Sequence, residues 1–270
     1  MKGFDRLFYR SRQMHAESRS RALLSVKGSI TASDWRRYTS TLRLFDLYPG
    51  VHGAGVVYPV RTGEIETFRR DHPGVNVHPL KGCVRPPPSE AGYAHFVIGI
   101  VEPLAPNAAA IGLDLASETN RQQAGIQSMD TGEAWVTRQI QLVQDNRSRP
   151  GFLLYLPVYA NGSPTGTVAE RRAAFQCWIY APFIFEEFVR NVLNEKKREI
   201  DYFVFDGATT KPASLIYAST GAHIGEQPLG VGQGKPFLGL LQADQKRRRG
   251  QADGAKVVHT CTSGPEMIPC

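Results

Sequence analysis

The order of apolar and polar residues along the chain predicts a succession of strands with helices between them. Short apolar runs bounded by glycine, proline or asparagine are typical of buried strands. Residues 134–143 instead alternate between apolar and polar, as a strand buried on one face does. The predicted strands are residues 53–60, 93–101, 134–143, 151–159, 172–180, 200–205 and 213–219.

Helical spacing of apolar residues marks the segments before and between these strands. Residues 4–28 have no internal glycine or proline, and their apolar positions are sparse, which is typical of a stalk or interface helix. Ser33 begins a second helix whose apolar face carries Trp35 and Tyr38, and Pro49-Gly50 ends it. Further helices are predicted over residues 64–70, from Ser117 to about Met129, and from Pro182 to about Leu193.

This order of elements predicts an α+β fold. Three consecutive strands joined by short turns favour an antiparallel sheet, and helices on one side of it form a second layer. Such an arrangement is PAS-like: a curved antiparallel sheet whose helices close a small pocket. We predict stalk helices over residues 1–47, a PAS-like ligand-binding module over 48–182, and a linker helix with a smaller PAS-like module over 183–270. The tail from residue 220 shows little regular pattern.

Composition indicates a globular protein with local excesses of positive charge. The chain has 270 residues, of which 41% are hydrophobic, and a net charge of +7. Much of the positive charge lies in residues 1–27 and in the run from Lys246 to Arg249. Such clusters can contact phosphates. No aromatic residues interleave the second cluster, however, so we expect solvated charge and no nucleic-acid partner.

No segment has the length and apolarity of a membrane-spanning helix. The longest nearly apolar run, residues 173–185, is interrupted by Gln176 and Pro182. The charged first residues do not resemble a signal peptide. Taken by itself, the chain is expected to be soluble, either as such or as the soluble part of a membrane protein.

Catalytic and metal-binding motifs are absent from the sequence. It contains no GxSxG, HExxH, Walker or dinucleotide-binding motif, its seven histidines are scattered, and its four cysteines have no zinc-ligand spacing. We therefore expect no enzyme, no cofactor and no metal. Cys177 is expected to be a small buried filler, and Cys261 and Cys270 could form a bridge in an oxidising compartment.

Two carboxylates stand out after the second strand. Glu102 ends that strand and Asp114 stands between two leucines, so both are placed to lie near the mouth of one pocket. A buried carboxylate must be paired, and a ligand with N–H donors would satisfy Asp114 through a charge-assisted hydrogen bond. The alternatives are that Asp114 caps the helix beginning near Ser117, or that it pairs with Arg121 or Arg138.

Six motifs in order carry a resemblance to a known family. They are YPGV (48–51), EP…N (102–107), G-x-D (112–114), TG-x-A (131–134), LPVY (156–159) and ER…YAPF (170–183). Over residues 35–193 the chain thereby resembles the CHASE domain, the ligand-sensing input domain of bacterial and plant transmembrane receptors. The resemblance implies a long N-terminal helix and two PAS-like modules, of which the membrane-distal one binds ligand. It also implies a periplasmic or extracellular location in a receptor such as a histidine kinase or a nucleotide cyclase, including diguanylate cyclases.

The same resemblance implies a set of ligand-binding residues. In plant cytokinin receptors, which bind adenine-type hormones, the aspartate matching Asp114 contacts the adenine ring. The strand matching 134–144 lines the pocket and places Val136 and Thr137 near the ligand, and a downstream polar pocket residue aligns near Asp145. With Glu102 and Leu113, these residues form the predicted site for a small, possibly adenine-like molecule. Receptors of this type commonly dimerise through the stalk helix, so a homodimer is expected.

Three departures from the family pattern leave other interpretations open. No flanking transmembrane helices are present, Cys177 stands where the family usually has glycine, and the C-terminal residues contain no convincing apolar final strand. The cysteine side chain is expected to narrow either the pocket or the packing. The alternatives to a receptor domain are a soluble small-molecule binder without signalling output, or an unrecognised hydrolase that uses Glu102 and Asp114. Dimerisation through residues 4–28 would favour the sensor.

Overall fold

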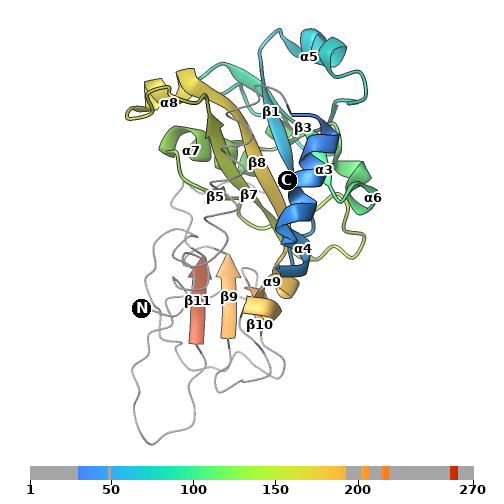
Figure 1. The fold of residues 1–270 in the computed structure, drawn as a ribbon. Helices are drawn as coiled ribbons and strands as arrows, with labels where there is room; N and C mark the ends of the chain where they lie inside the picture. Colours follow the sequence, from blue (N-terminus) through green and yellow to red (C-terminus); the bar gives the residue numbers. More distant parts are fainter. Residues whose placement is uncertain (1–29, 48–49, 193–201, 207–214, 219–255, 261–270) are drawn as a thin grey trace, which may run out of the picture.

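The computed structural model describes residues 30–47, 50–192, 202–206, 215–218 and 256–260 (Figure 1). The predicted stalk helix over residues 4–28 lies outside the described residues, as do Cys261 and Cys270. In chain order the elements are α3 (Ala32–Leu42), α4 (Leu44–Leu47), β1 (Ala54–Arg61), α5 (Ile65–Asp71), β2 (His78–Pro79), β3 (Tyr93–Glu102), α6 (Leu104–Asn107), η1 (Ala108–Ala110), β4 (Leu113–Asp114), η2 (Leu115–Ser117), α7 (Thr119–Thr131), β5 (Trp135–Val136), β6 (Ile140–Gln141), β7 (Pro150–Tyr159), α8 (Val168–Ala174), β8 (Phe175–Ile184), α9 (Phe185–Val192), β9 (Tyr202–Asp206), β10 (Leu215–Ala218) and β11 (Lys256–Thr260).

A mostly antiparallel sheet of eight strands forms the centre of the molecule, in the order β2-β4-β3-β1-β8-β7-β5, with β6 also paired to β7. The long ladders β1·β3 and β7·β8 are hairpin-like halves, and β1·β8 joins them. Only the short β2·β4 pair is parallel within this sheet. The predicted α+β class with an antiparallel sheet is therefore confirmed.

Helix α3 covers one face of this sheet. Its N-terminus is closed by a capping box in which Thr31 and Asp34 bond each other's backbone N–H groups, so Thr31, not Ser33, is the cap. Trp35 is 1% exposed and donates its indole N–H to the carbonyl of Ala54 on β1 (2.8 Å). The helix ends at Leu42, earlier than Pro49-Gly50 predicts, because Arg43 adopts a left-handed conformation (φ 48°).

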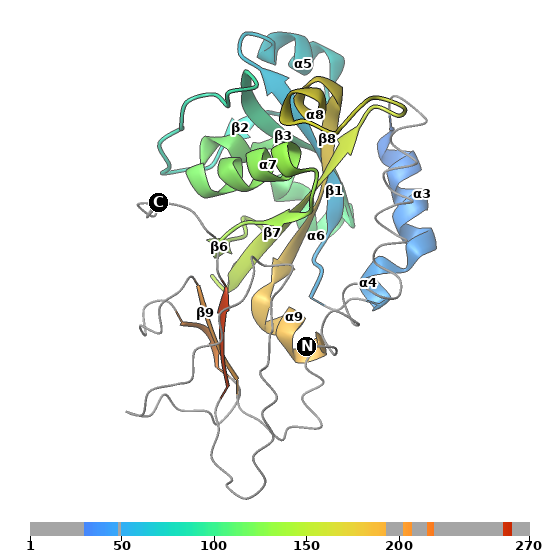
Figure 2. The same cartoon turned by 90° about the vertical axis from the view of Figure 1, so that its left-hand side faces the viewer.

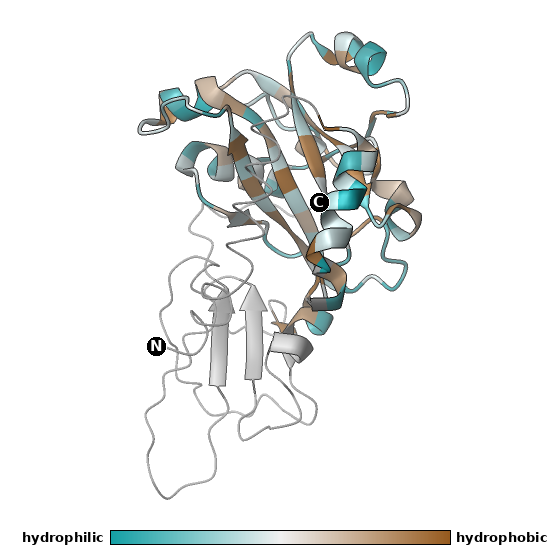
Figure 3. Cartoon of the chain, viewed as in Figure 1, coloured by the Kyte–Doolittle hydropathy of each residue, from teal (hydrophilic) through white to brown (hydrophobic). Residues whose placement is uncertain are grey.

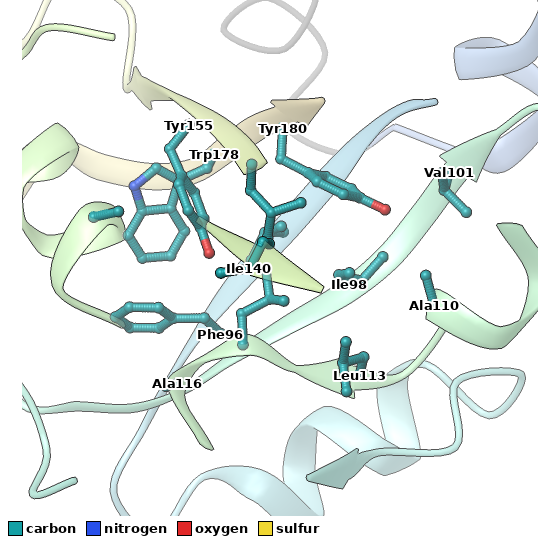
Figure 4. Packing of buried hydrophobic residues seen from close by; sticks show 14 of the residues in the cluster. Phe96, Ile98, Val101, Ala110, Leu113, Ala116, Ile140, Tyr155, Trp178 and Tyr180 are labelled. Atoms are coloured by element: carbon teal, nitrogen blue, oxygen red, sulfur yellow. The ribbon is translucent and has the colours of Figure 1, made fainter. Parts of the chain in front are cut away.

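Helix α7 covers the opposite face, so the sheet lies between two layers (Figure 2). Gly125 lets α7 approach closely, because a β-carbon there would lie 3.0 Å from the ring of Phe96. Trp178 of β8 donates its indole N–H to the Gly125 carbonyl (3.0 Å), and its ring packs at a tilt of 49° against Phe96 with the ring centroids 4.5 Å apart. Apolar residues follow the strands of the large sheet, as Figure 3 shows, and Figure 4 shows the cluster beneath α7.

Cys177 lies on the α3 face and not on the α7 face. It is 4% exposed and belongs to the cluster that contains Trp35 and Val56. Burial raises the pKa of its thiol to about 12, so it remains a neutral apolar filler. The cysteine side chain is thus accommodated by packing under α3, and it does not enter the interior beneath α7.

Several predicted boundaries are wrong. The predicted strand 172–180 begins only at Phe175, because Thr167 and Glu170 form a capping box that starts helix α8. Pro182 lies within β8 and does not start a helix, which begins at Phe185. The predicted strand 134–143 is reduced to two short pairings with β7.

A second sheet follows α9, in the order β10-β9-β11. Strands β9 and β10 correspond to the two predicted strands, and they pair antiparallel. Strand β11 was not predicted; it pairs parallel with β9 through Lys256 to Thr260, so the tail does contribute a strand. Throughout the described ranges, no helix combines the length and apolarity needed to cross a membrane.

Candidate functional site

Asp114 is fully buried and its carboxylate is bound on both oxygens. Oδ1 accepts from the backbone N–H groups of Phe96 (2.9 Å) and Ala116 (3.0 Å). Oδ2 lies 2.6 Å from Nδ1 of His95 and 2.8 Å from Nη1 of Arg85. The bond to Ala116 makes Asp114 the cap of the short η2, whereas α7, the helix predicted to begin near Ser117, is capped by Glu118, so the prediction that Asp114 caps that helix is wrong. Its side-chain partners are Arg85 and His95, and neither predicted arginine fills that role.

The electrostatic environment keeps Asp114 ionised. Burial alone would raise the pKa of this carboxyl. The hydrogen bonds from His95 and Phe96 and the charge of Arg85 outweigh burial, so the net pKa is lowered from the ordinary value. A ligand that donates to Oδ2 would therefore have to replace His95 or Arg85 there.

The other residues predicted from the second strand have separate surroundings. Glu102 is 8% exposed and accepts from Nε of Arg36 on α3 (2.9 Å). Leu113 belongs to the buried cluster beneath α7. Neither Glu102 nor Asp114 lines either of the two cavities described below, and their side-chain partners lie on different elements.

Val136 and Thr137 lie at the junction between the large sheet and α9. Val136 is buried in a cluster with Phe152 and Phe185. Thr137 is 3% exposed and exchanges bonds with Leu153, donating its backbone N–H (3.0 Å) and accepting at Oγ1 (3.0 Å). These bonds hold residues 134–143 beside β7, although the segment pairs with β7 only as the two short strands β5 and β6.

A cavity lies on the α7 side of the molecule. It has a volume of about 840 Å³ and is bounded by the β2–β3 loop, the first turn of α7 and the segment from Arg138 to Pro150. Asp145 is the one predicted site residue in its lining. The other lining residues that matter for its chemistry are Leu80, Lys81, Glu118, Thr119, Arg121, Arg138, Ile140, Leu142, Val143 and Arg149.

Arg121 and Glu118 form a buried ion pair in the wall of this cavity. Glu118 caps α7 by accepting from the backbone N–H groups of Asn120 and Arg121. Its Oε2 also lies 3.1 Å from Nη1 of Arg121, and Nη2 of Arg121 donates to the carbonyl of Gln141 (2.7 Å). Residues three apart on a helix can form an ion pair, so the Glu-x-x-Arg spacing at the start of the predicted helix indicates this pair. The spacing does not indicate that the pair is buried.

Asp145 connects the large cavity to a smaller one. Arg149 donates to Asp145 from both Nε and Nη2 (3.1 and 2.7 Å), and its Nη1 bonds Glu187 of α9. Glu187 also pairs with Nε2 of His52 (2.8 Å). These residues line a cavity of about 360 Å³ together with Asn107, whose amide donates to the carbonyl of His52 (2.8 Å).

The sequence model of the CHASE domain matches residues 28–217, well over half of the chain. The chain belongs to the CHASE domain family. CHASE domains are extracellular sensory ligand-binding domains of receptors, and this agrees with cavities built from polar side chains on a rigid sheet. A comparison with curated proteins finds no match. Within the described part of this CHASE domain, no group of three or more His, Cys, Asp or Glu residues is placed to hold a metal ion.

Proposed function

We propose that this CHASE domain is the small-molecule-sensing input of a transmembrane receptor, and that its ligand binds in the 840 Å³ cavity beside α7. The volume lies within the range of ligand pockets in proteins. The observation that carries the proposal is Arg121. It is 4% exposed and lines the cavity, and its guanidinium is held in place by Glu118 and by the carbonyl of Gln141. A fixed charged group therefore borders the space that a ligand would fill.

The finer assignments follow from the family. The receptor would be a histidine kinase or a nucleotide cyclase, with this domain held in the periplasm or outside the cell. Residues 48–182 would form the PAS-like ligand-binding module. An antiparallel sheet with α7 on one face and a cavity at their margin supports that assignment.

Different residues would bind the ligand and support the loop beside the cavity. Asp145 and Arg149 border the cavity, so a ligand would contact them directly. Asp114 lies outside the cavity lining, and in this proposal it holds the β2–β3 loop through Arg85. An adenine-type ligand that donates to Asp114, as the family resemblance implies, would displace that arginine.

Native mass spectrometry of the purified protein tests the proposal. The matched variants are Thr119→Trp, which fills the cavity at the first residue of α7, and Gln127→Trp, which adds the same bulk at an exposed site on the same helix. We expect a co-purified small molecule in wild type and in Gln127→Trp, and none in Thr119→Trp. Equal retention of the molecule by both tryptophan variants would place the ligand elsewhere.

A further inference from the structure

The loop between β2 and β3 forms one rim of the 840 Å³ cavity, and Figure 2 shows this loop beside α7. Residues 80–83 of the loop line the cavity. A second rim is formed by the segment from Arg138 to Pro150, which also lines it. Two segments that are distant in the sequence therefore border one space, and a movement of the loop would change how far that space is open to solvent.

The loop is anchored on both sides of residues 81–84. Before them, the backbone N–H of Leu80 donates to Oγ of Ser117 (2.8 Å). After them, Nη1 of Arg85 lies 2.8 Å from Oδ2 of the buried Asp114. These two contacts fix where the segment starts and where it ends, so a movement at this rim would be confined to the four residues between them.

The segment 81–84 itself has few contacts. Among the residues that the structure describes, Lys81, Gly82 and Val84 form no hydrogen bond and no ion pair. Exposed segments with few such bonds are the parts of a fold that rearrange most easily. Gly82 has a φ of 80°, and a β-carbon there would meet nothing within 4 Å. Packing therefore does not require a glycine at this position, whereas the left-handed backbone of a hinge does.

Both rims of the cavity carry an exposed valine. Val84, which directly follows the lining residue Cys83, is 86% exposed. Val143 lines the cavity from the second rim and is 37% exposed. Single exposed apolar residues are common on protein surfaces, but these two lie on the borders of the same space. Contact between them would remove apolar surface from water and would stabilise a closed form of the cavity.

We propose that residues 81–84 are a flap that closes over the cavity by turning at Gly82 and packing Val84 against Val143. The anchors at Leu80 and Arg85 stay in place, so the large sheet does not change when the flap moves. Closure shields the cavity from solvent and slows the release of a bound molecule. This inference rests on the proposed function, because the flap covers the same cavity.

Disulfide trapping tests the contact between the two valines. All native cysteines except the buried Cys177 are first replaced by serine. The test pair is Val84→Cys with Val143→Cys, and the control pair is Val84→Cys with Val168→Cys, whose second position is 41% exposed but does not line the cavity. A disulfide requires α-carbons within about 7 Å of each other. Burial of one valine stabilises a contact by about tenfold in population, so under a mild oxidant we expect the test pair to form its disulfide about tenfold faster than the control pair. Equal rates in the two pairs would overturn the flap.

The release of the co-purified molecule supplies a second readout. Native mass spectrometry at intervals after dilution measures how fast this molecule leaves the test pair. We expect the oxidised test pair to release it at least about tenfold more slowly than the same protein after reduction. Equal release from the oxidised and reduced forms would show that the disulfide does not close the cavity, and would overturn the flap.

The two experiments separate the flap from the proposed function. Disulfide trapping uses no ligand, so it decides whether the two rims meet even where no molecule co-purifies. Absence of a co-purified molecule, or its full retention in Thr119→Trp, would instead contradict the proposed ligand site. Equal Tm values for the reduced variants and for wild type would establish that the cysteine pairs leave the fold intact.

Discussion

At the residue scale, Asp114 shows how a buried charge organises its surroundings. Its two oxygens receive two backbone N–H groups, a histidine and an arginine. Ser117 adds to this arrangement, because its hydroxyl donates to the Asp114 carbonyl (2.6 Å) and accepts from the backbone N–H of Leu80 (2.8 Å). The β2–β3 loop is thus tied to the sheet through one aspartate and its neighbour.

Replacing Asp114 by asparagine should destabilise the domain in a pH-dependent way. The loss of charge-assisted bonds should lower the free energy of unfolding by about 1–3 kcal/mol at neutral pH. The folded-state pKa of Asp114 lies below its ordinary value of 3.8, so the unfolded chain binds a proton first as pH falls. The stabilisation is therefore complete above the unfolded pKa and is lost as pH falls through the folded pKa.

Urea unfolding of wild type and Asp114→Asn across the acidic range measures this effect. The difference between the two proteins should narrow as the pH falls below 3.8. Comparing the variant with wild type at each pH cancels the contributions of Asp145 and Glu187, whose pKa values are also lowered. A difference that stays constant over the whole range would show that the charge of Asp114 does not stabilise the fold.

The sequence indicates that Asp114 is special, but it does not reveal its partners. A carboxylate between two leucines must be paired, and this reasoning holds. Arg85 comes from a proline-rich loop and His95 from a strand 19 positions away, so no local spacing links them to Asp114. The surroundings of the Tyr155 and Tyr180 hydroxyls, which have no hydrogen-bond partner among the described residues, are equally invisible, because the sequence shows only two aromatic residues in apolar strands.

At the element scale, the long apolar strands are predictable and the interrupted ones are not. β1, β3 and β7 match the predicted runs because their pattern of burial follows the apolar pattern closely. Pro182 misleads because proline usually marks the end of a strand. Here β1 begins at Ala54, and its ladder with β8 runs only from Tyr180 to Trp178, so Pro182 lies beyond the β1·β8 pairs.

Helix α9 is the element through which the cavity can influence the second sheet. Glu187 on α9 bonds Arg149, which lines both cavities, and His52 beside β1. On its apolar side α9 packs with Phe152 and, through the same cluster, with Ile216 of β10. A ligand that draws Arg149 toward itself would therefore weaken a contact that holds α9.

Glu187→Ala should loosen α9 while leaving the large sheet intact. Glu187 is partly exposed, so the free energy of unfolding should fall by at most about 1 kcal/mol. Amide hydrogen exchange over Phe185–Val192 should nevertheless become faster, because the helix loses its ionic contacts with His52 and Arg149. Exchange rates over Phe185–Val192 that equal those of wild type would show that the contacts of Glu187 do not hold α9.

At the scale of the whole molecule, the described residues form a large sheet, a connecting helix and a small sheet in succession (Figure 1). The cluster around Val136 and Phe185 joins them, and Val136 lies in β5, the next strand along the chain after α7. Val136, which the sequence predicts to contact ligand, therefore packs between the large sheet and α9. This cluster therefore provides the packing contact between the large sheet, α9 and β10.

The oligomeric state distinguishes a receptor sensor domain, which is expected to dimerise, from a small-molecule binding protein without signalling output, which need not. Residues 4–28 are predicted to form a stalk helix that pairs between two copies. Deleting residues 1–29 should leave the fold intact, because the capping box that starts α3 is formed by Thr31 and Asp34. We therefore expect sedimentation velocity to show a dimer for the full chain and a monomer for the truncated chain, with Tm of the truncated form unchanged at low protein concentration. If the full chain is monomeric, or if the truncated chain still dimerises, residues 4–28 do not mediate dimerisation. Ligand sensing would then have to be read out through α9 and the small sheet alone.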